Sequence, residues 1–166
     1  MKPWMHAVVY QLTWFVTVLL GNVWALLWAL PLAFTLIWRQ PPAALAFVAT
    51  VGLAGYGVDL ALQAMGWVSF HGNTAAGPLW LLVLWLAFAN VIWHLLYRIP
   101  GVWLQALLGA VSGPLSYYGG AVLGAAEPLS TQGLIAFGIW WAIAFPAFVA
   151  LRKRWPAQGR TQWSRP

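Results

Sequence analysis

The sequence contains no cysteine, so it offers no disulfide, no thiolate metal ligand and no cysteine nucleophile. Acidic residues number only two, and charged residues make up 6% of the chain against 63% hydrophobic residues. A soluble domain carries about 25% charged residues, so this composition excludes a soluble monomer and a disordered chain. The apolar runs are continuous. We therefore predict an all-α, polytopic transmembrane helix bundle.

The first uncharged stretch, between Lys2 and Arg39, is long enough for two membrane spans of about 20 residues. Gly21 and Asn22 tolerate positive φ and predict a turn within it, with one long kinked helix as the alternative. A single straight helix of that length would rise well beyond the ~30 Å hydrocarbon layer, so we favour two. The six predicted spans are Trp4–Gly21, Asn22–Trp38, Ala43–Gly66, Leu79–Tyr97, Val102–Ala125 and Gly133–Leu151.

The positions of the cations predict the orientation. Six spans place both termini on one side, and all eight lysines and arginines then fall on that side, whereas the opposite loops carry only Glu127. Because lysine and arginine accumulate in the cytoplasm, we predict a multi-pass membrane protein with both termini inside. Residues 1–151 then form the six-helix domain, and residues 152–166 form a basic cytoplasmic tail. So short a tail does not predict nucleic-acid binding, despite the net charge of +6.

Polar side chains in the first, third, fourth and fifth predicted spans follow helical spacing, so each of these spans presents one polar stripe. Depth along the spans, at ~1.5 Å per residue, divides the stripes into two clusters. The outer cluster is predicted to contain Asp59, Gln63 and Tyr117 or Tyr118, with His71 and Glu127 nearby; Tyr56 lies on the same stripe as Asp59. The inner cluster is predicted to contain Gln11, Asn90, His94 and Gln105; Gln11 shares the stripe of the first span with His6, near its cytoplasmic end. Asp59 and His94 lie at different depths, so we do not expect them to form a catalytic pair.

Asp59 is the sharpest candidate because it is the only acid deep within a predicted span. Its carboxyl group is either a structural group satisfied by a neighbouring tyrosine or a site for a proton, a cation or an amine. His94 is either a hydrogen-bonded packing residue or a proton relay. The three histidines show no spacing typical of a metal site, so we predict no metal, and no motif indicates a cofactor.

Tryptophan is abundant, with 14 copies. Several copies fall at span ends, as in an interfacial aromatic belt, whereas others lie deeper and either pack or line a groove for a ligand. The predicted fifth span carries a stripe of small residues that permits close helix packing. This stripe serves either packing within the chain or a homo-oligomer contact, and Pro114 is expected to interrupt the helix. The glycines of the stripe are Gly109, Gly113, Gly120 and Gly124.

Several segments, in order along most of the chain, resemble the bacterial membrane family called domain of unknown function 2878. The segments are Gln11-Leu-Thr-Trp14-Phe15, Gly55-x-x-x-Asp59 with Gly66 and Phe70, Pro78-Leu-Trp80 with Leu84-Trp-Leu-Ala-Phe88-Ala and His94, and Gly109-Ala-x-x-Gly113-Pro114-Leu-x-Tyr117 with Leu123-Gly124. The resemblance implies an inner-membrane protein of unassigned activity, with a lipid-linked accessory role suggested by gene neighbourhoods that encode enzymes modifying fatty-acyl chains.

Three functions fit these observations. The first, which we favour, is a non-enzymatic membrane protein: a small transporter or an accessory protein of membrane lipid metabolism, with membrane lipids and a membrane or peripheral enzyme as partners. The second is a membrane-embedded enzyme that modifies lipid or isoprenoid chains, with Asp59 or His94 as acid or base. The third is a structural scaffold without a site, in which the polar residues only hold the helices together.

Overall fold

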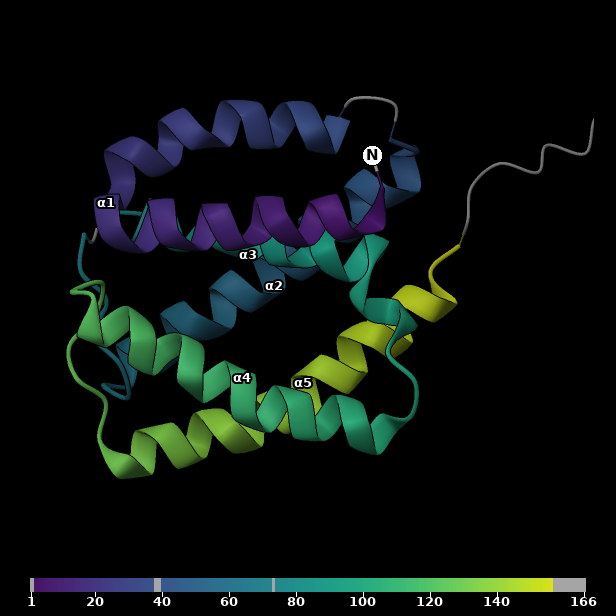
Figure 1. Cartoon of the computed structure of the whole chain (residues 1–166). Coiled ribbons are helices and arrows are strands. Elements are labelled where there is room, and N and C mark those ends of the chain that lie inside the picture. The colour runs from purple at the N-terminus through teal and green to yellow at the C-terminus, as the bar shows by residue number, and fades with distance from the viewer. Residues whose placement is uncertain (1, 38–39, 73, 157–166) are drawn as a thin grey trace, which may run out of the picture.

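The computed structural model describes residues 2–37, 40–72 and 74–156, and these residues form an all-α bundle (Figure 1). Outside the helices, the described residues contain one isolated β-bridge, which pairs Phe70 with Ala126. The all-α prediction is therefore confirmed. The elements are α1 (Pro3–Ile37), α2 (Pro42–Ala64), α3 (Leu79–His94), the 3₁₀ turn η1 (Leu96–Arg98), α4 (Val102–Val122) and α5 (Thr131–Arg154).

Helix α1 consists of two helical segments that meet at Gly21. This residue has φ 68° and ψ −159°, a conformation that glycine tolerates and that breaks the helix. The Trp28 indole N–H donates to the Thr13 hydroxyl over 2.8 Å. In a straight helix, these two residues would lie roughly 22 Å apart at ~1.5 Å per residue. The second segment therefore folds back along the first (Figure 1), and the turn predicted at Gly21 is present.

The start of α1 and the ends of α3 and α5 lie at the same end of the bundle (Figure 1). There the His6 ring stacks on the His94 ring, and the Arg152 guanidinium donates to the backbone carbonyl of Trp93. At the opposite end, Asn22 donates to the carbonyl of Gly72 in the loop after α2. The described cations therefore gather at one end, which we call the cationic end. Arg39, Arg160 and Arg165, together with Trp38, lie outside the described residues.

The helices form two groups. Helix α3 packs against α1 and α2, whereas α4 packs mainly against α5, and the contact between α3 and α5 is small. Two glycines of the small-residue stripe provide the close approach of α4 to α5: a Cβ on Gly109 would lie 2.2 Å from the Trp141 carbonyl oxygen, and one on Gly113 would lie 2.3 Å from the Trp141 ring. Both glycines thus serve packing within the chain.

Two predicted features of the last two helices differ from the structure. Pro114 lies inside α4 without interrupting it, because the helix runs continuously from Val102 to Val122. Helix α5 continues to Arg154, so the first three residues of the predicted tail form its last turn. The later part of that tail, residues 157–166, lies outside the described residues.

Three helices are long and apolar enough to cross a membrane by length and composition: Pro3–Ala33, Pro42–Ala64 and Thr131–Arg154. This number is smaller than the six predicted spans. The two segments of α1 belong to one apolar helix that turns at Gly21. Helix α3 is apolar but has only 16 residues, and α4 is rich in glycine and polar residues. Large apolar side chains cover the outside of the bundle, and Leu30 is 71% exposed.

Candidate functional site

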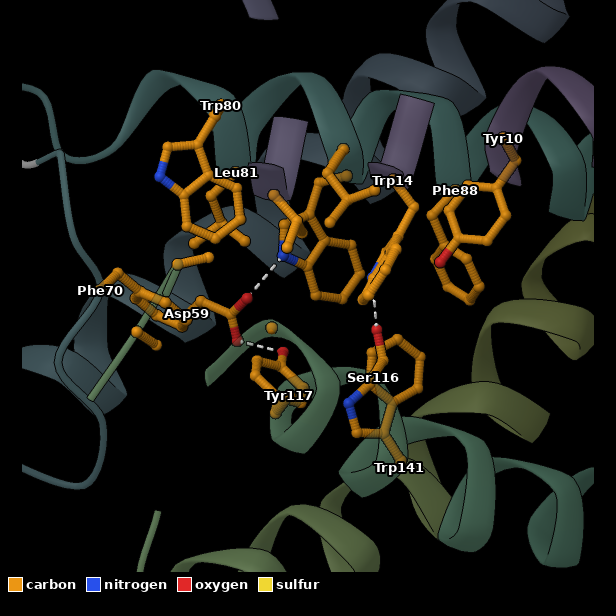
Figure 2. A pocket seen from close by; sticks show the side chains of 16 residues that line it. Tyr10, Trp14, Asp59, Phe70, Trp80, Leu81, Phe88, Ser116, Tyr117 and Trp141 are labelled. Carbon is orange, nitrogen blue, oxygen red and sulfur yellow. Dashed lines mark hydrogen bonds between the residues drawn. The ribbon is translucent and has the colours of Figure 1, made fainter. Parts of the chain in front are cut away.

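Asp59 is fully buried near the end of α2, and both of its carboxyl oxygens accept hydrogen bonds (Figure 2). The Trp85 indole N–H of α3 donates to Oδ2 over 2.7 Å, and the Tyr117 hydroxyl of α4 donates to Oδ1 over 2.7 Å. Gly55 precedes Asp59 by one turn, and a Cβ there would lie 2.2 Å from the Trp85 ring. The absence of a side chain at Gly55 therefore admits the indole that reaches the carboxylate.

Asp59 lies at a cavity of about 50 Å³ between the two helix groups (Figure 2). Aromatic and aliphatic side chains form most of its wall, among them Trp14 of α1, Phe70 of the loop after α2, and Leu84 of α3. Asp59 is the only carboxyl group among the lining residues. The volume exceeds the 10–15 Å³ that one water molecule requires, so the site can hold small polar or apolar groups next to the carboxyl group.

A second cavity, of about 290 Å³, adjoins the first toward the cationic end. The two cavities share four lining residues, which are Tyr10, Phe88, Ser116 and Trp141. We call the two cavities together the interhelical groove. They follow the boundary between α1 and α3 on one side and α4 and α5 on the other. The Trp14 indole N–H bridges this boundary by donating to the Ser116 hydroxyl over 2.9 Å (Figure 2).

The inner polar cluster differs in membership from the prediction. The Asn90 side-chain nitrogen lies 3.1 Å from His6 Nδ1, and the His6 ring stacks on the His94 ring with centroids 3.7 Å apart. His94 Nε2 is buried and forms no hydrogen bond with any residue that the structure describes. Gln105 is buried and donates to the carbonyl of Ile99, where it fastens the connector before α4.

The prediction that Gln11 belongs to the inner cluster is wrong, because its side chain is exposed. The rotation of the first segment of α1 directs His6 inward and leaves Gln11 outside. Sequence reasoning therefore assigned the wrong polar residue of this segment to the cluster. The sequence predicts His6 on the same stripe as Gln11, and the structure separates them by placing only His6 against His94.

The remaining polar residues of the predicted outer cluster have partners other than Asp59. The Tyr56 hydroxyl donates to the carbonyl of Ala76. The Gln63 side-chain oxygen accepts from the backbone N–H of Phe70, which holds the loop after α2 against the groove. Tyr118 is exposed, so Tyr117 is the tyrosine that reaches Asp59.

His71 and Glu127 form an exposed ion pair at the end opposite the cations, with 3.0 Å between His71 Nε2 and the carboxylate. His71 Nδ1 also lies 2.8 Å from the carbonyl oxygen of Gly124. Both ring nitrogens thus face acceptors, and only the protonated imidazole can donate to both. The hydrogen bond to Glu127, followed by the one to Gly124, raises the pKa of His71 above its usual value. Within the described ranges, no three histidine or acidic side chains gather as metal ligands.

A family model matches most of the chain. The model of the family described as a protein of unknown function (DUF2878) matches residues 3–147, which include every residue of the interhelical groove. The chain belongs to this family, as its sequence motifs indicate. No curated protein and no solved structure matches the chain.

Proposed function

We propose that the chain is a six-pass protein of the bacterial inner membrane that holds an apolar, lipid-like ligand in the interhelical groove. In this proposal it acts as a small transporter-like or accessory protein of membrane lipid metabolism. The observation that carries the proposal is the groove itself: an aromatic and aliphatic channel between two helix groups, with Asp59 as its one carboxyl group.

The six passes are supported by the hairpin at Gly21 and by the common position of the cations. Each segment of α1 follows the long axis of the bundle (Figure 1), and the connectors alternate between the two ends. A chain with all of its described lysines and arginines at one end favours an orientation with that end in the cytoplasm. The exposed apolar side chains of the outer surface then face the acyl chains of the bilayer.

The chemistry of the groove favours a chain-like ligand. Aromatic rings such as Trp80 and Phe88 provide flat apolar contact, and the two cavities follow one another along the helices. Asp59 provides the single carboxyl group of the groove, near the end away from the cations, with its oxygens oriented by Trp85 and Tyr117. An alkyl or isoprenoid chain fits two adjoining cavities whose walls are mostly aromatic and aliphatic.

A role as an enzyme receives less support from the geometry. Asp59 bonds to Trp85 and Tyr117, whereas His94 contacts His6 at the cationic end, so the two titratable groups do not act on one atom. Acid–base catalysis would therefore depend on one of these groups alone, and both oxygens of Asp59 already accept hydrogen bonds from the protein. The accessory form of the proposal instead predicts that a membrane or peripheral lipid-modifying enzyme co-purifies with the chain in mild detergent.

Photo-crosslinking with a diazirine-bearing palmitic acid in phosphatidylcholine nanodiscs tests the proposal. Gly120 lies in the groove wall, and a Cβ there would meet nothing within 4 Å, so Gly120→Leu fills the cavity without a clash at its root. Gly57→Leu is the matched control, because Gly57 is exposed on α2 and equally free of neighbours. Cross-linked residues are then mapped by peptide mass spectrometry.

The wild type and Gly57→Leu are expected to carry cross-links on groove residues such as Phe88 and on outward residues such as Ile139. Gly120→Leu is expected to lose the groove cross-links and keep the outward ones. A wild type labelled only on outward residues would show that the groove takes no chain. Equal labelling of the groove in all three proteins would support a scaffold whose cavity has no specific ligand.

A further inference from the structure

The cationic end of the interhelical groove holds two arginines on one aromatic platform. The Arg152 guanidinium carbon lies 3.5 Å from the centroid of the Trp93 ring and 4.7 Å from that of Tyr97. Its Nε also donates to the carbonyl of Trp93 over 3.1 Å. Arg98 donates to the Tyr97 hydroxyl over 3.3 Å, and its guanidinium carbon lies 5.5 Å from the same ring. We call Arg98 and Arg152 the arginine pair.

No acid of this chain can neutralise the arginine pair. The whole sequence has two acidic residues, and both are committed elsewhere: Asp59 to Trp85 and Tyr117, and Glu127 to His71 at the opposite end. The last turn of α5 adds Lys153 and Arg154 to the same end. Two guanidinium groups gathered at one tyrosine ring repel each other, and an anion between them would relieve that repulsion.

The arginine pair adjoins two residues that line the groove. Leu96 and Ile99, which line the second cavity, flank Tyr97 and Arg98 in the η1 connector. Gln105 fastens this connector to α4 through the carbonyl of Ile99, so the cavity wall and Arg98 are held together. Ring stacking occupies the face of the Arg152 guanidinium and leaves N–H groups at its edge, where a phosphate group accepts two parallel hydrogen bonds.

We infer that the interhelical groove binds an anionic phospholipid, with its phosphate headgroup on Arg98 and Arg152 and an acyl chain extending past Leu96 and Ile99 toward Asp59. This inference rests on the proposed function and names the class of its ligand. The apolar cavity provides the site for the acyl chain, and the unneutralised arginine pair favours a negatively charged headgroup. A zwitterionic lipid offers the same chain, but its own cationic group weakens the attraction to the two guanidinium groups.

Native mass spectrometry in a mild detergent tests the inference with dioleoyl phosphatidylglycerol, dioleoyl phosphatidylcholine and inorganic phosphate as separate probes. The wild type is expected to retain one phosphatidylglycerol at least about tenfold more tightly than phosphatidylcholine. Arg98→Gln and Arg152→Gln are expected to abolish this preference. Lys153→Gln removes a cation from the same helix turn outside the arginine pair, so it is the matched control and is expected to keep the preference.

Inorganic phosphate is expected not to displace phosphatidylglycerol at equal concentration, because it has no chain for the groove. Displacement at equal concentration would assign the arginine pair to a free anion and overturn the lipid assignment. Arg152 also supports Trp93 and its substitution can unfold the chain; exposed Arg98 then decides the outcome. Equal binding of the two lipids by the wild type, or an unchanged preference in Arg98→Gln, would overturn the inference.

The failure of this inference differs from the failure of the proposed function. If the diazirine fatty acid labels the groove but lipid binding ignores headgroup charge, the groove function stands and the arginine pair is not its headgroup site. If phosphatidylglycerol binding depends on Arg98 and the groove remains unlabelled, lipid binds only at the surface and both the acyl-chain position and the proposed function are wrong.

Discussion

Replacement of Asp59 tests whether its two hydrogen bonds stabilise the packing of the two helix groups against each other. Asp59→Leu leaves the Trp85 N–H and the Tyr117 O–H buried without an acceptor. An unpaired buried donor costs about 1–3 kcal/mol. Single hydrogen bonds within membrane proteins contribute less, about 0.6 kcal/mol on average and about 1.7 kcal/mol at most. For the loss of both bonds we therefore expect a decrease of about 2 kcal/mol in the free energy of unfolding.

Asp59→Asn separates charge from hydrogen bonding. Trp85 can only donate, so the amide oxygen of asparagine faces the indole and the amide N–H donates to the Tyr117 oxygen. Both positions remain hydrogen-bonded, and we expect a loss of less than about 1 kcal/mol. Equilibrium unfolding in mixed micelles measures both variants. A loss for Asp59→Asn as large as that for Asp59→Leu would show that negative charge, rather than hydrogen bonding, is the stabilising property.

A double-mutant cycle with Tyr117→Phe isolates one of the two bonds. Phenylalanine removes the hydroxyl, so in its background Asp59→Leu leaves only the Trp85 N–H without an acceptor. The loss caused by Asp59→Leu should then fall by about half, which corresponds to a coupling free energy of about 1 kcal/mol. Distant, independent sites add within about 0.3–0.5 kcal/mol. A coupling below about 0.3 kcal/mol would refute the assignment of the hydroxyl as a partner that stabilises the fold.

Three further predictions concern packing, pH and topology. Gly109→Ala places a Cβ 2.2 Å from the Trp141 carbonyl oxygen and should destabilise the chain by about 1–3 kcal/mol, whereas the neighbour-free Gly57→Ala should stabilise it slightly in the same unfolding assay. The hydrogen bond to Glu127 raises the pKa of His71 in the folded protein. The ion pair should therefore stabilise the fold fully below pH 6.5, the usual pKa of histidine. That stabilisation should be lost as the pH rises through the higher folded-state pKa. Glu127→Gln should flatten this pH dependence of thermal stability, and an unchanged profile would contradict the sign. Because the chain has no native cysteine, Ala75→Cys and Lys153→Cys can be labelled singly in oriented cells, and only Ala75→Cys should react with an impermeant maleimide; equal external reactivity of both would contradict the six-pass topology.

Sequence reasoning located the helices because the signals for their ends are local. The composition indicates a chain without enough charge for a water-facing surface. Proline at Pro41 and Pro42 starts α2, and Gly101 with φ 70° precedes α4. Gly21 is a further example, since its positive φ produces the hairpin of α1 that the Gly-Asn pair predicts. Helix boundaries depend on a few neighbouring residues, so these features are readable without any tertiary contact.

Only the tertiary structure decided which polar groups meet. The rotation of α1 about its axis selects His6 for the inner cluster and exposes Gln11. The Trp85 indole reaches Asp59 because Gly55 leaves space for it, and this relation joins residues of two different helices.

The tertiary structure also forms the arginine pair, because η1 brings Arg98 and α5 brings Arg152 to the ring of Tyr97. Apolar positions are similar all around these helices, so hydropathy does not specify their rotation or their neighbours. Close packing of individual side chains specifies both, and it therefore determines where the groove runs and which polar groups line it.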